Sequence, residues 1–374
     1  MSDQTQGQTQ GGDGPAWPPP APGQQPSYPA PGYPAPGYGY GQPTAYAAPP
    51  AYPVYPAFPH AEPQPYHQML RTWSYAWWKP VVGIVLLILG FFLVAPLALL
   101  PIVLIGVIPQ DGDYLDNLMG ALSFETIEPV SLLYLNLTLG SIILVTWGIE
   151  RFVHRLRPRW LSSVVPKLRW RFLGVCMGLS VVALVAQVVV GQLVPGDTEA
   201  DLSGAVNDFT GTTLVLAVIV VLTTPLQAAG EEYAFRGYLT QAVGSLTRSA
   251  WFAVLVPALI FAIVHGAQNV PLFFDRFMFG VIAGWLVIRT GGLEAGIALH
   301  VLNNLLAFGF ALTFGDISES LMVSEVSWWN IPLTLTQSGV YAALVILVAR
   351  RMGLQTRTRP PVEAQQAAAG ALPV

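Results

Sequence analysis

The stretch GTTLVLAVIVVLTTPLQAAGEEYAFRGYL, residues 211–239, decides how this chain is placed. Its first part is apolar enough to lie in lipid, yet two adjacent glutamates, Glu231 and Glu232, and then Arg236 follow directly. A charged side chain at membrane depth costs roughly 2.5 to 17 kcal/mol, so such groups are seldom accidental there. Whether the stretch lies in a membrane depends on the rest of the chain.

The composition favours a polytopic membrane protein. The 374 residues are 53% hydrophobic and only 10% charged, whereas a typical soluble domain is about 25% charged. The net charge of −4 gives no indication of a nucleic-acid partner. A single cysteine, Cys176, allows no disulfide framework within one chain and suggests no cysteine-based metal site.

The first 66 residues are rich in proline, glycine and tyrosine and nearly free of charge. Proline at this density prevents helix and strand formation, so we expect a disordered, partly polyproline-like tail over residues 1–66. Such a tail either binds an unknown partner or serves as an inert tether. No signal-peptide pattern is expected in it. Residues 353–374 are expected to form a second disordered tail.

The chain between the tails predicts an all-α membrane domain, residues 67–352. A membrane-spanning helix needs about 20 apolar residues. Eight segments qualify, and the first carries Pro96 and Pro101, which predict a kink or a strong tilt. They are residues 80–108, 130–149, 171–194, 211–243, 250–268, 270–289, 293–315 and 331–349.

The loop charges support eight helices with both termini in the cytoplasm. If the N-terminus is cytoplasmic, Arg276 is the one basic residue of 17 that does not fall at the inner side, and the acidic residues gather in the outer loops. This is the positive-inside bias of membrane proteins. An odd number of helices would place the basic C-terminal stretch outside. We therefore expect a multi-pass protein of the cell membrane, and the tail and compact core favour a bacterial plasma membrane.

Polar residues inside the spans gather in the second half of the chain, which predicts one shared cavity built from segments four, five and seven. Glu231 and His265 each lie 17 positions from Arg248, near the turn of a helical hairpin. In two antiparallel helices, residues equally far in sequence from the turn lie at about the same depth in the membrane, so these two side chains can face each other. This requires the fourth helix to continue past Gly230 through the glutamates, after a bend at Pro225.

The two glutamates are expected to differ in role. Glu232 and Arg236 are four positions apart and share a helix face, so they can pair and remain charged at depth as a structural brace. Glu231 points about 100° away and is expected to have no partner on its own helix. It is the candidate base, or else a glutamate satisfied by backbone or water near the interface.

His300 and Asn304 are also four positions apart, so an imidazole and a carboxamide project to one side, with Asn303 nearby. Together they could donate two hydrogen bonds to one oxygen, as an oxyanion hole requires. The alternatives are ordinary: polar residues that hold helices together, and, for His265 at the end of IFAIVH, a hydrogen-bonded core histidine.

Three ordered motifs carry a family resemblance. EEYAFR at 231–236, FAIVH at 261–265 and HVLNN at 300–304 resemble the EExxxR, FxxxH and HxxxN motifs of the CPBP family. These are the CAAX-protease and bacteriocin-processing (Abi-type) intramembrane proteases, which include the type II CAAX prenyl endopeptidases. The resemblance covers about residues 130–350. Each motif alone is weak, and the three in order are specific.

The resemblance implies an eight-helix intramembrane peptidase whose site opens toward the cytoplasm. Carried over by position, it implies that Glu231 and His265 activate water, that His300 and Asn304 stabilise the oxyanion, and that Glu232 and Arg236 hold the geometry. Phe261, one turn before His265, would pack beside the site. No motif position is missing.

A bound metal stays open. Members of the family are often labelled metalloproteases, and Glu231, His265 and His300 could supply a two-histidine, one-carboxylate zinc set. Against this, the chain has no HExxH helix, and binding Glu231 to zinc would remove the candidate base. We favour the metal-free alternative.

We therefore predict an intramembrane endopeptidase that acts on a membrane-associated or lipidated polypeptide. One alternative is a proton-coupled transporter that uses Glu231 and His265 as a relay, although transporters usually show matching features in both halves. The other is a non-catalytic membrane scaffold that binds partners through its tail.

Overall fold

The computed structural model describes residues 58–194 and 206–359, and within these ranges the regular secondary structure is helical, with two isolated β-bridges and no strand. The predicted all-α class is thus confirmed. Most of the two expected tails, residues 1–57 and 360–374, lies outside the described residues. In chain order the elements are η1 (Tyr66–Gln68), α1 (Trp78–Leu89), η2 (Gly90–Val94), α2 (Ala95–Gly106), α3 (Tyr114–Ser123), α4 (Pro129–Phe152), η3 (Pro158–Trp160), α5 (Trp170–Gly191), α6 (Gly211–Glu232), η4 (Tyr233–Leu239), α7 (Thr240–Thr247), α8 (Ala250–Ile263), α9 (Val270–Thr290), α10 (Glu294–Phe314), α11 (Ile317–Leu321) and α12 (Asn330–Arg351).

Seven helices of the described ranges are long and apolar enough to cross a membrane, so the protein is a multi-pass membrane protein. They match seven of the eight predicted spans to within a few residues. The remaining predicted span, residues 250–268, is not confirmed at full length, because α8 has 14 residues. At 1.5 Å per residue it is about 21 Å long, against about 30 Å of hydrocarbon.

The end of α8 corrects the prediction for segment five. The helix ends at Ile263, so His265 lies in the loop that follows and not deep in a helix. Gly266 has φ +83°, a left-handed conformation that favours glycine and ends the helix. The loop runs to Asn269, whose side chain caps α9 and also donates to the Val326 carbonyl at 2.8 Å, in the segment before α12.

The fourth span is one continuous helical stretch, Gly211–Thr247, which confirms that the helix runs on through Glu231 and Glu232. Its middle part, η4, is a π-helix, and α7 completes the stretch. The turn to α8 falls at Arg248, as predicted. π-Helical turns inside α-helices are rare and occur frequently at functional sites.

The first span is also interrupted, in the region where prolines predict a distortion. A π-helical segment, η2, separates α1 from α2 and ends two residues before Pro96. Proline lacks the amide proton that would bond four residues back, and its ring crowds the carbonyl there. The wider π turn accommodates both effects.

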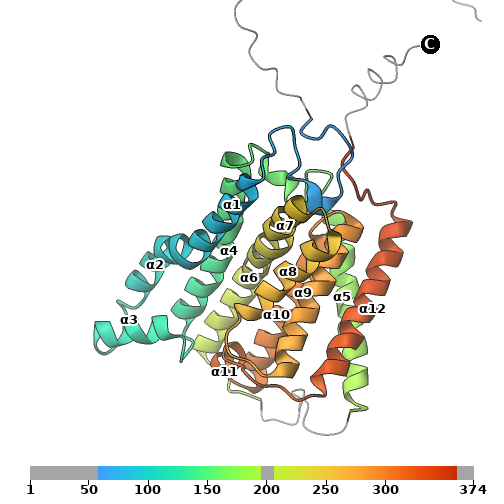
Figure 1. Ribbon diagram of the computed structural model, residues 1–374. Helices are drawn as coiled ribbons and strands as arrows, with labels where there is room; N and C mark the ends of the chain where they lie inside the picture. The colour runs from blue at the N-terminus through green and yellow to red at the C-terminus, as the bar shows by residue number, and fades with distance from the viewer. Residues whose placement is uncertain (1–57, 195–205, 360–374) are drawn as a thin grey trace, which may run out of the picture. The chain divides into compact units, whose positions relative to one another are not determined.

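The helices run side by side, with α6 packed between α4 and α10 (Figure 1). α8 packs on α9, and α12 packs on α5 and α9. Small residues allow the close approach of α6 to α4, since Gly230 lies against the Leu139 backbone. In the same interface Asn136 donates to Thr223 at 2.9 Å and Thr224 at 3.1 Å. Side chains such as Val85, Phe92, Val185 and Leu222 are exposed, as expected of a lipid-facing surface.

Both ends of the described chain meet at one end of the helices. The backbone amide of Gln64 donates to the Thr358 hydroxyl at 2.8 Å, and the Thr358 amide donates to the Gln64 carbonyl at 2.9 Å. Tyr66 is fully buried beside them and its hydroxyl donates to the Leu161 carbonyl. Residues 58–66, assigned to the tail from composition, therefore pack on the helices. Ends on the same side are what an even number of crossings requires.

Candidate functional site

The buried ion pair Glu232–Arg236 forms the floor of the site. Glu232 ends α6 and Arg236 lies in η4, and the distance from Glu232 Oε1 to Arg236 Nη1 is 3.0 Å. Both side chains are almost completely buried. The i,i+4 pair predicted from the sequence thus forms, even though the intervening turn is π-helical.

Aromatic rings enclose the guanidinium of Arg236. Its central carbon lies 4.1 Å from the ring centre of Phe261 on α8 and 4.8 Å from that of Phe279 on α9. A cation over the face of an aromatic ring is attracted by the ring quadrupole. The charge is therefore held by one carboxylate and two rings.

Glu231 has a partner on its own helix, contrary to the sequence prediction. Gln227, one turn earlier, donates its amide to Glu231 Oε1 at 2.7 Å, and its own carbonyl oxygen accepts from Asn304 Nδ2 at 2.9 Å. Gln227 therefore joins the candidate base to the predicted oxyanion donor. The sequence carried a signal for this contact, because positions i−4 and i share a helix face.

His300 lies between the two carboxylates. Its Nδ1 is 2.9 Å from Glu232 Oε1, and its Nε2 is 3.6 Å from Glu231 Oε2. Because a carboxylate oxygen of an ion pair accepts, Nδ1 is the nitrogen that donates to Glu232. The ring thereby has a fixed orientation, with Nε2 turned to Glu231. Residues 231, 232 and 300 from two separate helices thus meet in one polar group, in which His300 bonds Glu232 and lies close to Glu231.

Gly296 explains how α10 comes this close. A methyl group at this position would collide with Glu232 Oε2, so the backbone of α10 approaches the carboxylate where a side chain could not. Asn303 belongs to a different contact: its Oδ1 accepts from Gln337 on α12 at 3.0 Å. The structure thus places Asn304, and not Asn303, in the group around Glu231.

His265 approaches from the loop after α8 and is exposed at the protein surface. Its Nδ1 donates to the Phe261 carbonyl at 2.7 Å, since a carbonyl can only accept, and Nε2 is left with a free lone pair. The Phe261 ring lies 4.6 Å from the His265 ring and 5.9 Å from the His300 ring. Phe261 thus lies against both histidine rings, whereas the sequence led us to expect only that it packs beside the site.

The residues do not assemble the three-ligand zinc set considered from the sequence. Within residues 58–194 and 206–359, no group of three or more His, Cys, Asp or Glu side chains is arranged to hold a metal ion. Glu231, Glu232 and His300 are turned toward one another and toward Gln227 and Arg236. We therefore derive no step through a metal.

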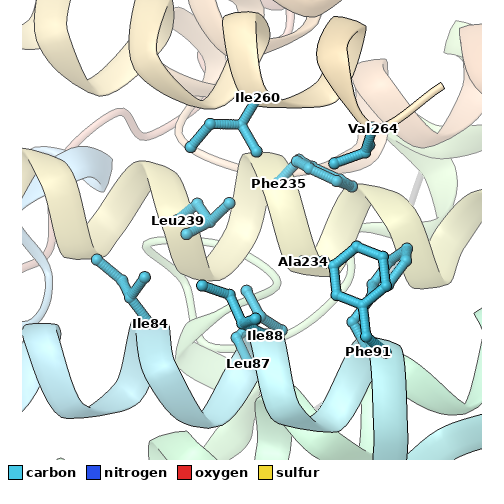
Figure 2. Close-up of a pocket in the computed structure, with 10 residues that line it drawn as sticks. Ile84, Leu87, Ile88, Phe91, Ala234, Phe235, Leu239, Ile260 and Val264 are labelled. Carbon is cyan, nitrogen blue, oxygen red and sulfur yellow. The ribbon is translucent and has the colours of Figure 1, made fainter. Parts of the chain in front are cut away.

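An apolar pocket borders the site, with a volume of about 80 Å³. Figure 2 shows Ile84, Leu87 and Ile88 of α1 and Phe91 of η2 on one side, with Phe235 and Leu239 of η4 and Ile260 and Val264 opposite. The pocket is lined by apolar side chains alone. Two of its lining residues lie next to residues of the site: Val264 precedes His265 in the chain, and the Phe235 ring lies 5.2 Å from that of Phe261.

Comparisons with known proteins bear on the same part of the chain. The chain is 24% identical over 212 residues to the uncharacterized protein YyaK of Bacillus subtilis strain 168, a match that covers 54% of this chain and 69% of the relative. No solved structure matches the chain significantly. Residues 211–306 match the family model described as type II CAAX prenyl endopeptidase Rce1-like. Every residue of the polar group around Glu231 lies inside that range, and over these residues the chain is similar to the Rce1-like type II CAAX prenyl endopeptidases.

Proposed function

We propose that the protein hydrolyses a peptide bond of a membrane-associated or lipidated polypeptide at the group formed by Glu231, His265, His300 and Asn304. The match of residues 211–306 to the Rce1-like type II CAAX prenyl endopeptidases supports a protease whose substrate is a peptide at the membrane. The residue roles and the nature of the substrate are our proposal. The observation that carries it is the meeting of Glu231 with His300 at 3.6 Å, from helices far apart in sequence.

Glu231 is the proposed base. Gln227 occupies Oε1, so Oε2 is the oxygen that can take a proton from water. His265 offers the free lone pair of Nε2 as a second acceptor for the same water. The water oxygen then attacks the peptide carbonyl carbon, and the proton taken by Glu231 passes to the leaving amine. Positioned general bases contribute about 10²–10⁴-fold to rate.

His300 and Asn304 are the proposed donors to the oxyanion. Asn304 uses one hydrogen of Nδ2 for Gln227 and retains the other. His300 uses Nδ1 for Glu232, so it donates from Nε2 when both ring nitrogens carry protons. The pair Glu232–Arg236 fixes the orientation of that ring. Donors that are already oriented stabilise a developing oxyanion without reorganisation.

The apolar pocket between α1, η4 and α8 supports a lipidated substrate (Figure 2). A hydrocarbon group seated there would place the attached peptide beside His265. Prenylated CAAX proteins are one class of substrate that carries such a group next to the bond to be cut. The pocket volume of about 80 Å³ accommodates part of a long chain, and the rest would extend into lipid.

The test is cleavage of a fluorescent farnesylated peptide, beside the same peptide without the lipid, by purified protein in vesicles. Wild type should cleave the farnesylated peptide, and Glu231→Gln, which preserves shape, should lose at least about 100-fold in kcat. Glu325→Gln, an exposed acid far along the chain, is the matched control. A Glu231→Gln variant that keeps the full rate would refute the assignment of the base.

Two further arms separate the parts of the proposal. Equal cleavage of both peptides would remove the role of the apolar pocket and leave the chemistry intact. Metal analysis with a chelator arm tests the remaining alternative, because inactivation by chelator and recovery with zinc would assign Glu231 to a metal and not to proton transfer.

A further inference from the structure

An open, polar depression lies where the two ends of the described chain meet, at the end of the helices opposite α11 (Figure 1). Its volume is about 410 Å³, within the usual range of ligand sites. Three arginines from separate segments line it: Arg71 before α1, Arg248 at the turn between α7 and α8, and Arg357 after α12. None of them belongs to the group around Glu231.

The charges of these arginines are not neutralised by the described residues. Arg71 donates to the Ser245 carbonyl at 2.6 Å and Arg357 to the Pro63 carbonyl at 3.4 Å. Neither these two nor Arg248 forms an ion pair within residues 58–194 and 206–359. Glu62 is the single acid among the lining residues, so the depression carries an excess of about two positive charges.

Such an arrangement fits an anion with several oxygen atoms. Carbonyl dipoles position a guanidinium but do not cancel its charge, and like charges gathered in a concave surface concentrate a positive potential. Guanidinium groups match phosphate with paired, charge-assisted hydrogen bonds. Gln68 donates to the Arg248 carbonyl at 3.1 Å and holds the turn that presents this arginine, whose φ is +60°.

Exposed tryptophans place the depression at the level of lipid headgroups. Trp77 is 70% exposed and follows Arg71 by six positions, and Trp251 is 66% exposed and follows Arg248 by three. Tryptophan collects at the boundary between water and hydrocarbon in membrane proteins. Arginines next to these tryptophans in the chain are therefore expected close to that boundary.

We propose that this depression binds the phosphate group of an anionic phospholipid. Basic pockets at the cytoplasmic ends of transmembrane helices bind anionic headgroups, and each basic residue contributes about fivefold to affinity. Because one arginine comes from the chain before α1 and another from the chain after α12, the bound headgroup would join the two ends of the membrane domain. It is a lipid site and is independent of hydrolysis.

The test measures lipid retention by native mass spectrometry of the full chain purified in a neutral detergent. Short-chain phosphatidylglycerol should bind and phosphatidylcholine with the same acyl chains should not. Arg71→Gln, Arg248→Gln and Arg357→Gln together should weaken phosphatidylglycerol binding by about 100-fold. The matched control removes Arg155, Arg157 and Arg159, three exposed arginines outside the depression, and should retain binding.

Three results would contradict the proposal. An equal loss in the control would mean that bulk charge attracts the lipid. Inorganic phosphate that binds as tightly as the lipid, at matched ionic strength, would make this a site for a soluble anion. If the triple variant does not fold, Arg248→Gln alone should still lose roughly fivefold, because its side chain forms no ion pair among the described residues. An unchanged affinity in that variant would overturn the site.

Discussion

Replacing Glu232 by alanine should destabilise the folded protein far more than a typical surface substitution. In the structure this carboxylate is fully buried, pairs with Arg236 at 3.0 Å and accepts from His300 at 2.9 Å. The variant leaves a guanidinium that is 1% exposed without the oxygen that balances its charge. A buried charge without a partner is among the costly defects in a protein.

The magnitude follows from the contacts. Removing one member of a buried ion pair costs about 3–5 kcal/mol. The rings of Phe261 and Phe279 remain against Arg236 and each retains roughly 0.5–2 kcal/mol of attraction, which places the loss near the lower end. His300 loses its acceptor, which adds about 1 kcal/mol. The free energy of unfolding should fall by about 4 kcal/mol, close to a thousandfold in the folding equilibrium.

The assay is reversible unfolding in mixed micelles with increasing dodecyl sulfate, followed by tryptophan fluorescence and circular dichroism. A double-mutant cycle with Arg236→Met isolates the pair, and the double variant should be more stable than Glu232→Ala alone. Glu325→Ala, at an exposed acid, should change stability by less than about 0.5 kcal/mol. The reasoning fails if Glu232→Ala unfolds like wild type, or if the two single losses simply add in the double variant.

Two other outcomes follow from burial and close packing. Burial lowers the pKa of His67 and of His154 to about 4, with a nearby cation adding to the effect, so the unfolded chain binds more protons than the folded one between about pH 4 and 6.5. The free energy of unfolding should therefore fall as the pH drops from about 6.5 to 4, by up to about 3 kcal/mol for each histidine. Thermal melts across this pH range, on wild type and on a double variant with His67→Gln and His154→Gln, check this. Parallel plots of melting temperature against pH for the two proteins would contradict it. A methyl group at Gly230 would meet the Leu139 carbonyl, so Gly230→Ala should cost about 1–3 kcal/mol, whereas Gly178→Ala, which meets open space, should be neutral or stabilising in the same melt.

The spans and the order of the helices could be predicted from the sequence because apolar length and loop charge are one-dimensional signals. The predicted segment 171–194 corresponds to α5, Trp170–Gly191, and the segment 331–349 to α12, Asn330–Arg351. The short length of α8 was not predicted, because the apolar run continues to Val264, past the end of the helix at Ile263. Gly266 signals the end of one helix, and Asn-Val-Pro at 269–271 signals the start of the next. The prediction gave more weight to the apolar composition than to these two signals.

Only part of the candidate site could be predicted from the sequence. Spacing of four positions gives the Glu232–Arg236 pair and the shared side of His300 and Asn304, because the helix repeat alone fixes it. Spacing cannot say which neighbour a side chain meets on another helix. The position of His300 between two glutamates, and the turn of Asn303 toward Gln337, depend on how α10 is rotated against α6 and α12. Gln227 lies four positions before Glu231, the spacing of a contact on one helix face. Because glutamine is uncharged, its presence in a span did not demand a partner, and the contact was not predicted.

The pairing of Gln64 with Thr358 has a consequence for synthesis. The two residues are separated by 294 positions, so the ribosome must make every helix of the described residues before this contact can form. Until then the segment around Gln64 lacks this partner, while later helices enter the membrane. Closing so long a loop carries an entropy cost, which makes the contact a marker of completed assembly. A nascent chain arrested before Thr358 would therefore contain its membrane helices and still lack the hydrogen bonds between the segment before α1 and the segment after α12.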